Sequence, residues 1–342
     1  MLLDTDSPDF ALLNDFQRDF PLTSRPFAVL AERLGMSEEG VLAALARLQA
    51  AGRVSRVGPV FAPNRIGAST LAALAVAEAD LEAVAARVSA RPEVNHNYRR
   101  EHAYNLWFVV AASDEMRLAE VLDEIAADAG LPVLSLPLEG EFHIDLGFDL
   151  SAGIVGQVGQ QPDIPAKHLS GFLRKPDLQP LPGLVAALQG GLPLVPRPFA
   201  LIAETAGLNE VCTLAMIEDL VASGLIKRFG VVVRHHELGY RANAMCVWDV
   251  PDAVADELGG LLAGEAAVTL CYRRRRGALE RAAGWPYNLF CMIHGRQRQE
   301  VEGLHADLSR RLGLTAFAGD VLFSTRRYKQ CGARYMPEAC HG

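Results

Sequence analysis

The residues best suited to chemistry lie together in residues 94–110, which read VNHNYRREHAYNLWFVV. This stretch holds two histidines, two tyrosines and an arginine pair, namely His96, Tyr98, Arg99, Arg100, His102 and Tyr104. Histidine titrates near neutral pH and suits acid–base catalysis. Arginine suits planar, bidentate binding of carboxylate or phosphate groups. The stretch therefore predicts a site that binds an acidic ligand and transfers protons.

A second, altered copy of this stretch follows in residues 268–276, VTLCYRRRR, and residues 285–295, WPYNLFCMIHG. The tyrosines and arginines recur there as Tyr272, Arg273, Arg274 and Tyr287. The histidines do not recur, because His96 aligns with Leu270 and His102 aligns with Trp285. We therefore expect two related half-sites, of which the first does the chemistry.

The two hairpins belong to a duplication that covers most of the chain. Residues 25–35, RPFAVLAERLG, match residues 197–207, RPFALIAETAG. Further along, Arg56 recurs as Arg228. Between the copies, residues 151–183 are rich in Gly, Gln and Pro, which indicates a linker. The chain is therefore predicted to contain two copies of one unit.

Each unit must position its hairpin on a small framework of helices and strands. In the first unit, a helix ending at Gly35 and a helix capped by Ser37 and stopped by Gly52 precede a short hairpin at residues 53–61. This order is typical of a winged helix-turn-helix. Strands then alternate with helices over residues 69–78, 81–91, 94–112, 114–129 and 131–148. The resulting β-α-β-β-α-β order predicts a ferredoxin-like domain.

The second unit repeats this order, and its ferredoxin-like elements are expected at residues 241–250, 252–264, 267–274, 286–294, 297–313 and 315–328. The predicted fold class is α+β, a tandem duplication of a winged helix-turn-helix and a ferredoxin-like domain. The expected domains are 8–65 and 184–238 (winged helix-turn-helix), 66–150 and 239–335 (ferredoxin-like), with the linker at 151–183. Two such sheets pack face to face or edge to edge, so we expect a pseudo-dimer within one chain.

Charge argues against DNA as a partner. The net charge is −8, and the candidate recognition helix of the first unit begins with Glu38 and Glu39. Its counterpart carries Glu210, Glu218 and Asp219 and no basic residue. A recognition helix lies beside phosphates and needs positive charge. We therefore expect no DNA binding.

Other patterns bear on compartment and metal. No apolar run reaches the roughly 18–20 residues that span a bilayer. The N-terminus, MLLDTDSPDF, lacks the basic segment of a secretory signal. The six cysteines contain no CxxC pair, which speaks against a protein-bound metal. We expect a cytoplasmic protein with no membrane contact and no metal site of its own.

The wing segments carry a further group of basic residues. Arg56 and Arg228 occupy equivalent positions, and His235 and His236 follow the second wing. We expect these residues to reach the site from across the pseudo-two-fold axis. A hydrogen-bonded turn would explain the histidine pair equally well.

Four segments together carry a specific resemblance: VNHNYRREHAYNLWFVV, KRFGVVVRHHELGYRANAM, TLCYRR with WPYNLFCMIHG, and LFSTRRYKQCGARY. In this order they resemble the siroheme decarboxylases, Lrp/AsnC-like proteins, in the fused form in which two paralogous subunits share one polypeptide. The resemblance implies an Lrp-like fold that has lost DNA binding. It also implies removal of the ring C and ring D acetate carboxylates of siroheme as CO2. The product would be 12,18-didecarboxysiroheme, a step of heme d1 biosynthesis in denitrification.

This function assigns roles to the candidate residues. His96 is the expected leading acid/base, His102 a second one or a ligand to the substrate iron, and Arg56 a catalytic carboxylate clamp. The remaining candidates are expected to bind substrate: Tyr98, Arg99, Arg100, Tyr104, Arg228, His235, His236, Arg273, Arg274 and Tyr287. His143, Arg326 and Arg327, on matching final strands, are weaker candidates. No cofactor is expected beyond the iron that siroheme carries.

Several alternatives remain open at this stage. The second unit either closes the pocket of the first or carries an altered pocket of its own, and further homo-oligomerisation is open. His102 is otherwise a plain hairpin residue. The competing functions are a heme-responsive Lrp/AsnC-type transcription regulator and a module that binds a tetrapyrrole without catalysis. The difference in histidines between the copies argues against both, because simple binding does not require it.

Overall fold

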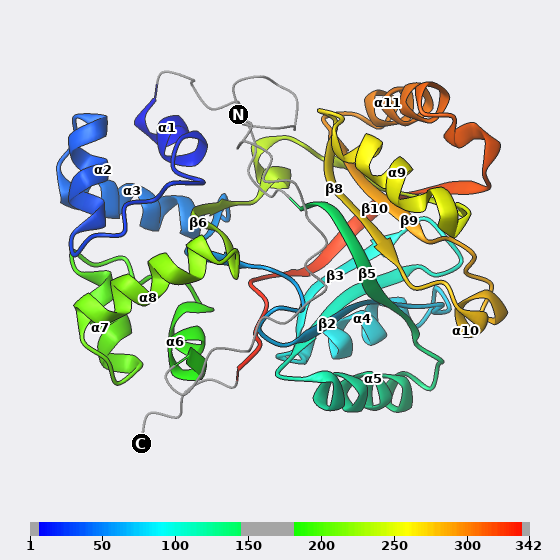
Figure 1. Cartoon of the computed structure of the whole chain (residues 1–342), viewed down its shortest axis with the longest axis horizontal. Coiled ribbons are helices and arrows are strands. Elements are labelled where there is room, and N and C mark those ends of the chain that lie inside the picture. Colours follow the sequence, from blue (N-terminus) through cyan, green and yellow to red (C-terminus); the bar gives the residue numbers. More distant parts are fainter. Residues whose placement is uncertain (1–6, 145–180, 337–342) are drawn as a thin grey trace.

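A computed structural model describes residues 7–144 and 181–336. The helical part of both units lies on one side and a β-barrel with its covering helices on the other (Figure 1). The predicted linker falls largely within residues 145–180, outside the described residues. The predicted duplication is thus visible as two paired layers, in which like domains from the two units associate.

The helical part contains three helices from each unit. These are α1 (Pro8–Asn14), α2 (Pro26–Leu34) and α3 (Glu38–Ala50) from the first, and α6 (Leu181–Leu188), α7 (Pro198–Thr205) and α8 (Glu210–Ala222) from the second. Local sequence explains their ends. The Ser37 side chain accepts a hydrogen bond from the Gly40 amide, and the Asn209 side chain does the same for Cys212. Gly35 ends α2 in the left-handed conformation.

The predicted wing hairpin at residues 53–61 is wrong. These residues form a single strand, β1 (Val54–Phe61), and its partner is the equivalent strand of the other unit, β6 (Ile226–Val233). The two pair antiparallel with Gly58 opposite Gly230. A strand needs a partner for its backbone groups, and the duplication supplies one across the pseudo-two-fold axis. One apolar core therefore joins both helical units.

Position 230, on β6, requires glycine because another part of the backbone passes close to it. A Cβ placed there would lie 2.5 Å from the carbonyl oxygens of both Phe16 and Gln17. We expect Gly230→Ala to lower the free energy of unfolding by about 1–3 kcal/mol in urea titrations, as overpacking does. Gly260→Ala is the matched control, because no atom lies within 4 Å of its Cβ, and it should be neutral or stabilising by up to about 1 kcal/mol. Equal stability of the two variants would contradict the close approach.

The ferredoxin-like order is confirmed in both units. The first contains β2 (Ala68–Leu74), α4 (Leu81–Ala90), β3 (Val94–Arg100), β4 (Leu106–Ala112), α5 (Glu115–Ala129) and β5 (Leu134–Ile144). The second contains β7 (Ala242–Trp248), α9 (Asp252–Ala263), β8 (Val268–Arg274), β9 (Leu289–Gly295), α11 (Arg298–Arg311) and β10 (Gly319–Gln330). The hairpin of the second unit is longer than that of the first, and its extra residues include the short helix α10 (Ala278–Ala282). The short 3-10 helices η1 (His235–Leu238) and η2 (Leu314–Ala316) complete the described elements.

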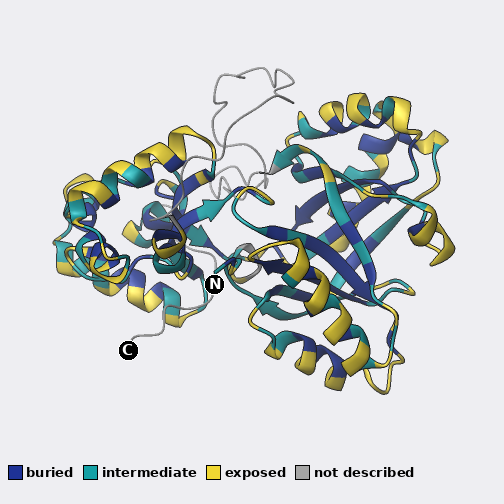
Figure 2. Ribbon diagram, turned by 60° about the horizontal axis from the view of Figure 1, so that its bottom comes forward, coloured by how far each residue is buried: buried dark blue, intermediate teal, exposed yellow. Residues whose placement is uncertain are grey.

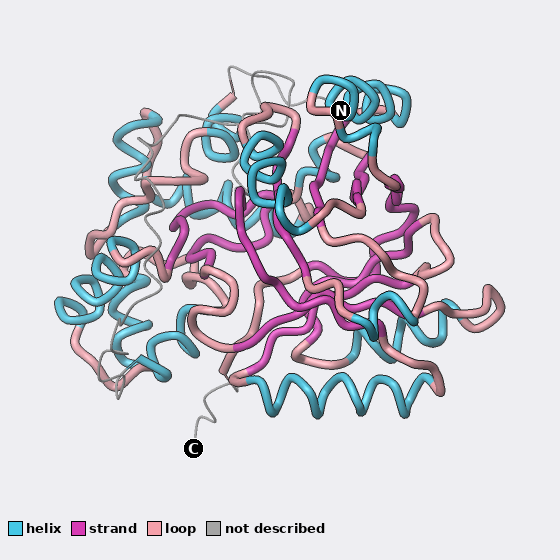
Figure 3. The backbone as a smooth tube through the Cα atoms, turned by 45° about the vertical axis from the view of Figure 1, so that its right-hand side comes forward, coloured by secondary structure: helices cyan, strands magenta, loops and turns pink. Residues whose placement is uncertain are grey.

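The two sheets meet edge to edge and close into one barrel, in the order β10-β3-β4-β2-β5-β8-β9-β7 (Figure 3). Closure depends on two long strands that each serve both units. The first half of β10 pairs with β7 and its second half with β3. In the same way, β5 pairs with β2 and then with β8. Each final strand therefore brings residues of its own unit beside the hairpin of the other.

Three apolar cores fix the barrel. Helices α4 and α5 cover the sheet of the first unit, and α9 and α11 cover that of the second, with an apolar core under each pair. A third core fills part of the barrel interior and includes Trp107, Tyr272, Trp285 and Phe290. Exposed residues lie on the outer faces of the helices, whereas the strands are mostly buried (Figure 2). The inner face of the barrel is therefore the enclosed surface on which a buried site can form.

The apolar helices bear on membrane contact within residues 7–144 and 181–336. No single helix there is long and apolar enough to cross a bilayer, although α7 and α8, bent by 92° relative to each other, pass the length and composition test as a pair.

Candidate functional site

Strand β3 presents its candidate residues alternately to the inside and the outside of the barrel. Tyr98 pairs with Trp107, a residue of the interior core, so His96, Tyr98 and Arg100 share the inner face. Asn97 points outward, and its amide donates to the carbonyl oxygen of Ala85 on α4 at 3.1 Å. Arg99 forms an ion pair with Glu78 at 3.0 Å. The structure thus separates the adjacent pair Arg99 and Arg100 onto opposite faces.

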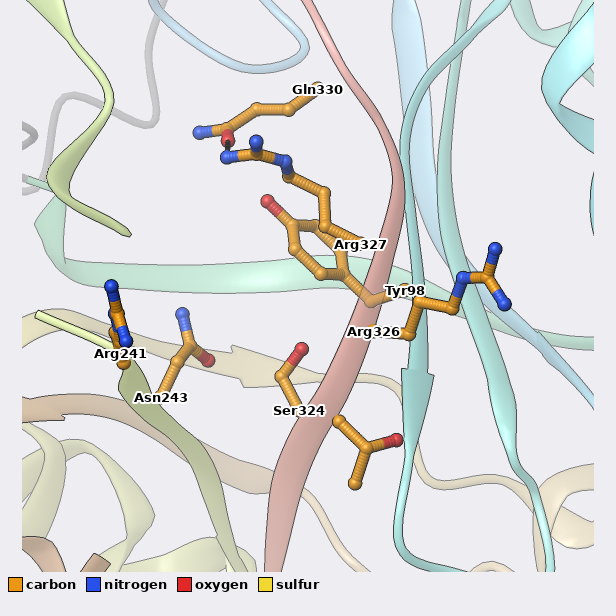
Figure 4. A pocket seen from close by; sticks show the side chains of 8 residues that line it. Tyr98, Arg241, Asn243, Ser324, Arg326, Arg327 and Gln330 are labelled. Carbon is orange, nitrogen blue, oxygen red and sulfur yellow. Dashed lines mark hydrogen bonds between the residues drawn. The ribbon is translucent and has the colours of Figure 1, made fainter. Parts of the chain in front are cut away.

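Tyr98 lies at one wall of a cavity of about 80 Å³ (Figure 4). The other lining residues come from the second unit: Arg241, Asn243, Ser324, Thr325, Arg326, Arg327 and Gln330. Arg327 lies above the tyrosine ring, where it donates to the side chain of Gln330 at 3.2 Å, whereas Arg326 extends away from Tyr98. Beneath the ring, the guanidinium carbon of Arg100 is 5.8 Å from the ring centroid. We call these lining residues the Tyr98 pocket, and we count with them Arg100, which contacts Asn243 at 3.4 Å and also lines the second depression described below.

The Tyr98 pocket is electrostatically positive. Burial raises the pKa of Tyr98, and the positive charges of Arg100, Arg327 and Arg234 act in the opposite direction. Burial also lowers the pKa of Arg100. Its guanidinium is fixed by donation to the carbonyl oxygen of Leu322 at 2.9 Å. Guanidinium groups gathered around a half-buried cavity favour a ligand with several carboxylates.

His96 lies next to this pocket, with its ring stacked at 6.3 Å from that of Tyr98. Its Nδ1 is 3.0 Å from the side-chain oxygen of Asn95. Burial, together with the positive charge of Arg56, lowers the pKa of His96 to about 4. Arg56 reaches this position from β1 and donates to the carbonyl oxygen of Pro59 at 2.8 Å. The structure therefore brings Arg56, His96, Tyr98 and Arg100 together, as the sequence predicted.

The low pKa of His96 gives a testable pH dependence. Because the folded state holds this imidazole neutral down to about pH 4, against 6.5 for an unperturbed group, protonation favours the unfolded chain. The contribution of neutral His96 to the free energy of unfolding is fully present above pH 6.5 and is lost as the pH falls toward 4. We expect His96→Asn to lose less unfolding free energy than the parent between about pH 7 and about pH 4.5 in urea titrations. Parallel losses in both proteins would contradict the assigned pKa.

The equivalent position in the second unit keeps the tyrosine as Tyr272 and the inner arginine as Arg274. It does not keep the polar side chains that surround Tyr98. The guanidinium carbon of Arg274 is 4.5 Å from the Tyr272 ring centroid, and its Nη1 donates to the Leu136 carbonyl oxygen at 2.6 Å. Opposite Tyr272, however, the register places Glu141 where Tyr98 faces Arg327. Lys227 neutralises Glu141, and Leu270 replaces His96. This half of the barrel therefore differs from the first at the positions of His96 and Arg327.

His102 lies elsewhere, near the tip of the first hairpin. The backbone amide of Tyr104 donates to its Nδ1 at 2.9 Å, and its Nε2 is 3.7 Å from Asp320. Burial lowers the pKa of His102, and Asp320 opposes that shift. The ring packs edge-on against Trp285 at 5.4 Å. His102 borders a second, more open depression of about 410 Å³ that also contains Arg99, Arg100 and Arg326.

Two aromatic candidates accompany His102. Tyr104 donates to the carbonyl oxygen of Ala283 at 2.7 Å, and Tyr287 packs edge-on against Trp285 at 4.9 Å. Trp285 is fully buried. These residues close the hairpin end of the barrel together with His102, which lies six residues along the chain from His96. They are therefore not among the residues that line the Tyr98 pocket.

The remaining candidates have other surroundings. Arg228 is buried in the helical part, where it donates to the carbonyl oxygen of Gln17 at 2.6 Å and burial lowers its pKa to about 9. Arg273 forms an ion pair with Asp256 at 2.7 Å. The weaker candidate His143 has its pKa lowered by burial and by Arg18. His235 and His236 begin η1, and their side chains lie outside the described residues.

Several lining residues were missed by sequence analysis. Arg241, Asn243, Ser324 and Gln330 line the Tyr98 pocket but were not among the predicted site residues. Arg327 was only a weaker candidate. The signal was present, since the segments RHHELGYRANAM and LFSTRRYKQCGARY contain all five residues. What the sequence lacked was the barrel closure that places β10 beside β3.

Binding of DNA or of a metal ion would each require particular side chains. At the start of the helices α3 and α8, Glu38 pairs with Arg25 and Glu210 pairs with Arg197. Both ion pairs occupy an arginine that would otherwise be free to contact phosphate. Within residues 7–144 and 181–336, no three His, Cys, Asp or Glu side chains are grouped closely enough to hold a metal ion.

Comparison with known proteins decides the family. A model of the siroheme decarboxylase NirDL-like HTH domain matches residues 9–54 and 183–227, and a model of the AsnC-like ligand binding domain matches residues 65–143 and 237–329. The siroheme decarboxylase NirDL subunit of Paracoccus denitrificans is 43% identical over 332 residues, covering 96% of this chain and 97% of that protein. The chain belongs to the siroheme decarboxylase NirDL family.

Two further members of the family support this assignment. The siroheme decarboxylase of Hydrogenobacter thermophilus is 32% identical over 330 residues, covering 96% of this chain and 94% of that protein. A crystal structure of a siroheme decarboxylase NirDL in co-complex with an iron-uroporphyrin III analogue is 30% identical, with a TM-score of 0.65. It covers 97% of this chain and 94% of that structure. The Lrp/AsnC-like architecture of both units is therefore a property of the NirDL family.

Proposed function

We propose that this chain is a siroheme decarboxylase, a carboxy-lyase that removes the ring C and ring D acetate carboxylates of siroheme and yields 12,18-didecarboxysiroheme. The observation that carries the proposal is the Tyr98 pocket, with His96 at its edge, in a chain of the NirDL family. Siroheme has eight carboxylates around a flat macrocycle. Such a ligand needs several arginines at its rim and an enclosed surface for the ring. Arg100, Arg234 and Arg327 supply positive charge there, and Arg327 also forms an ion pair with Glu237 at 2.6 Å.

The reaction needs a proton donor and an electron sink. Each net step consumes one proton and one acetate carboxylate and yields a methyl group and CO2. Protonation of a pyrrole carbon makes the ring an acceptor for the electron pair released when the bond between CH2 and the carboxylate breaks. A second protonation at that CH2 carbon and loss of the ring proton give the methyl group. The pyrrole is its own electron sink, so we propose no cofactor beyond the iron that siroheme carries.

His96 is the proposed proton carrier. In the free protein its imidazole is neutral, because burial and Arg56 lower its pKa to about 4. Carboxylates of a bound substrate oppose both the charge of Arg56 and the loss of solvation, and so raise that pKa toward the working range. His96 would thus accept a proton when substrate enters and deliver it to the ring. Arg56, which faces His96, would orient the departing carboxylate without neutralising it fully before the transition state.

We further propose that one pocket performs both decarboxylations. The Tyr98 pocket is lined by arginines, whereas the equivalent place beside Tyr272 has Glu141 and Leu270. There the ion pair between Glu141 and Lys227 stands in place of Arg327, so that position offers no net positive charge to a substrate carboxylate. The product of the first step would therefore have to turn within the pocket or rebind to present its second acetate. Both units of one chain line the pocket, so tetrapyrrole binding requires no further subunit. Homo-oligomerisation stays a prediction.

The competing functions are weaker on specific grounds. A DNA-binding regulator would need basic recognition helices, and α3 and α8 begin with glutamates that are paired with arginines. A non-catalytic tetrapyrrole module would have no need for a histidine held neutral in the pocket of one unit only. Neither alternative accounts for the difference between His96 and Leu270.

The test is anaerobic incubation of the purified full chain with siroheme, followed by mass spectrometry of the tetrapyrrole. We expect stepwise loss of two CO2 molecules. A stable siroheme complex of unchanged mass would overturn the proposal in favour of the binding module. If the protein shifts duplex DNA from the promoter of its own gene in a gel at physiological salt and does not turn over siroheme, the proposal is overturned in favour of the regulator.

A further inference from the structure

A buried chain of hydrogen bonds lies behind the Tyr98 pocket. It begins at Thr269 on β8, whose hydroxyl donates to the carbonyl oxygen of Met292 at 3.1 Å. The same hydroxyl oxygen is 3.0 Å from Nδ1 of His294 on β9. Nε2 of His294 is 2.8 Å from Nδ2 of Asn243 on β7. Thr269 and His294 are both buried, and Asn243 lines the pocket (Figure 4).

The direction of every bond in this chain follows from its two ends. A carbonyl oxygen only accepts, so the Thr269 hydroxyl must give its one proton to Met292. Its oxygen can then only accept, which makes Nδ1 of His294 the donor. At the other end of the chain Arg100 can only donate, so it takes Oδ1 of Asn243 and leaves the amide nitrogen facing Nε2 of His294, which must then accept. The amide nitrogen of Asn243 therefore donates to Nε2 of His294.

This assignment fixes the orientation of an amide in the pocket wall. With its nitrogen toward His294, Asn243 turns Oδ1 toward Nη1 of Arg100, which is 3.4 Å away and can only donate. A flipped amide would place its NH2 group against the guanidinium and leave two donors facing each other. His294 thus determines which atoms of Asn243 meet the ligand and supports Arg100 beneath Tyr98.

The same positions in the other half of the barrel lack the chain. The register pairs Ser69 with Ala111 in the first unit where it pairs Asn243 with His294 in the second. The Ser69 hydroxyl instead contacts the side chain of Asn64 at 2.8 Å. The hydrogen-bond chain therefore accompanies the arginine-lined pocket and is absent beside Tyr272, so it is not a requirement of the fold.

We propose that His294 is a positioning residue for substrate binding, which holds the Asn243 amide and, through it, Arg100 in the arrangement that receives a substrate carboxylate. This inference rests on the proposed function. His294 itself is buried behind the wall and acts through Asn243 rather than on the reacting atoms.

The experiment compares His294→Leu, His294→Gln, Asn243→Ala and the double variant His294→Leu with Asn243→Ala. Losing one hydrogen bond that orients a buried amide should raise the siroheme Kd by about 5- to 50-fold, with kcat within about threefold. His294→Gln keeps an acceptor for Asn243 and should bind within about threefold of the parent. The double variant should be no worse than the poorer single variant, because both remove the same arrangement.

A readout independent of siroheme is the tautomer of His294 in the parent, observed by nitrogen NMR of histidine-labelled protein. We expect a proton on Nδ1 and none on Nε2. The opposite tautomer, unchanged siroheme binding in His294→Leu, equal losses in the Leu and Gln variants, or additive losses in the double variant would each overturn the inference. If His294→Leu does not fold, the Gln variant and the tautomer still decide it. Absence of turnover in the parent, by contrast, counts against the proposed function.

Discussion

His96→Ala is expected to lower kcat for siroheme decarboxylation by about 100- to 10,000-fold, the usual contribution of a positioned acid or base. Its siroheme Kd should change little, because the arginines of the Tyr98 pocket remain. The physical reason is that, among the side chains that the structure describes, His96 is the imidazole that stacks on Tyr98, whereas His102 lies at the tip of the hairpin and accepts a hydrogen bond from the backbone amide of Tyr104. Single-turnover kinetics with mass detection separate the loss of chemistry from the loss of binding.

His305→Gln is the matched control for this prediction. His305 is also half-buried and its pKa is also lowered by burial, but it stacks on Trp248 under α11 at 5.5 Å, away from the pocket. It should keep turnover within about threefold of the parent, as substitutions remote from a site usually do. Two-step turnover by His96→Ala at the parent rate would rule out its role as the proton carrier.

Local sequence was sufficient to predict most of the elements, but Arg99 and Arg100 were both expected to bind substrate, and the structure places them on opposite faces. Caps such as Ser37 and Asp114 mark the observed starts of α3 and α5. Period-two alternation along β3 places His96, Tyr98 and Arg100 on one face and separates Arg99 from Arg100. The comparison of the two copies also pointed to the first hairpin, and the structure surrounds that hairpin with arginines.

Long-range pairing was what the sequence could not supply. A strand such as β1 has the same alternation whether its partner is the next segment or the equivalent strand of another unit, so its pairing with β6 was missed. The contributions of Asn243 and Arg327 to the pocket depend on the register between β10 and β3, which no local pattern encodes. For the same reason His102 was placed with His96 in sequence but lies apart from it in the barrel.

The pair Arg100→Met and Arg274→Met tests whether one pocket or two bind substrate. Both guanidinium groups are fixed in the same way, each donating to a strand carbonyl and lying against a tyrosine. Removing either should therefore lower the free energy of unfolding by a similar amount, about 1–3 kcal/mol, since each leaves a buried carbonyl without its donor. Only Arg100 belongs to the Tyr98 pocket.

We expect Arg100→Met to raise the siroheme Kd by about 10- to 100-fold, the effect of removing one charge-assisted contact to a carboxylate. Arg274→Met should bind and turn over siroheme as the parent does, despite its equal loss of stability, because Glu141 and Leu270 make its surroundings unfit for a polyanion. Titration by absorbance gives the Kd, and the number of siroheme molecules bound per chain should be one. Equal weakening by both substitutions, or a stoichiometry of two, would show instead that both halves of the barrel hold substrate. The two decarboxylations would then be divided between the two halves.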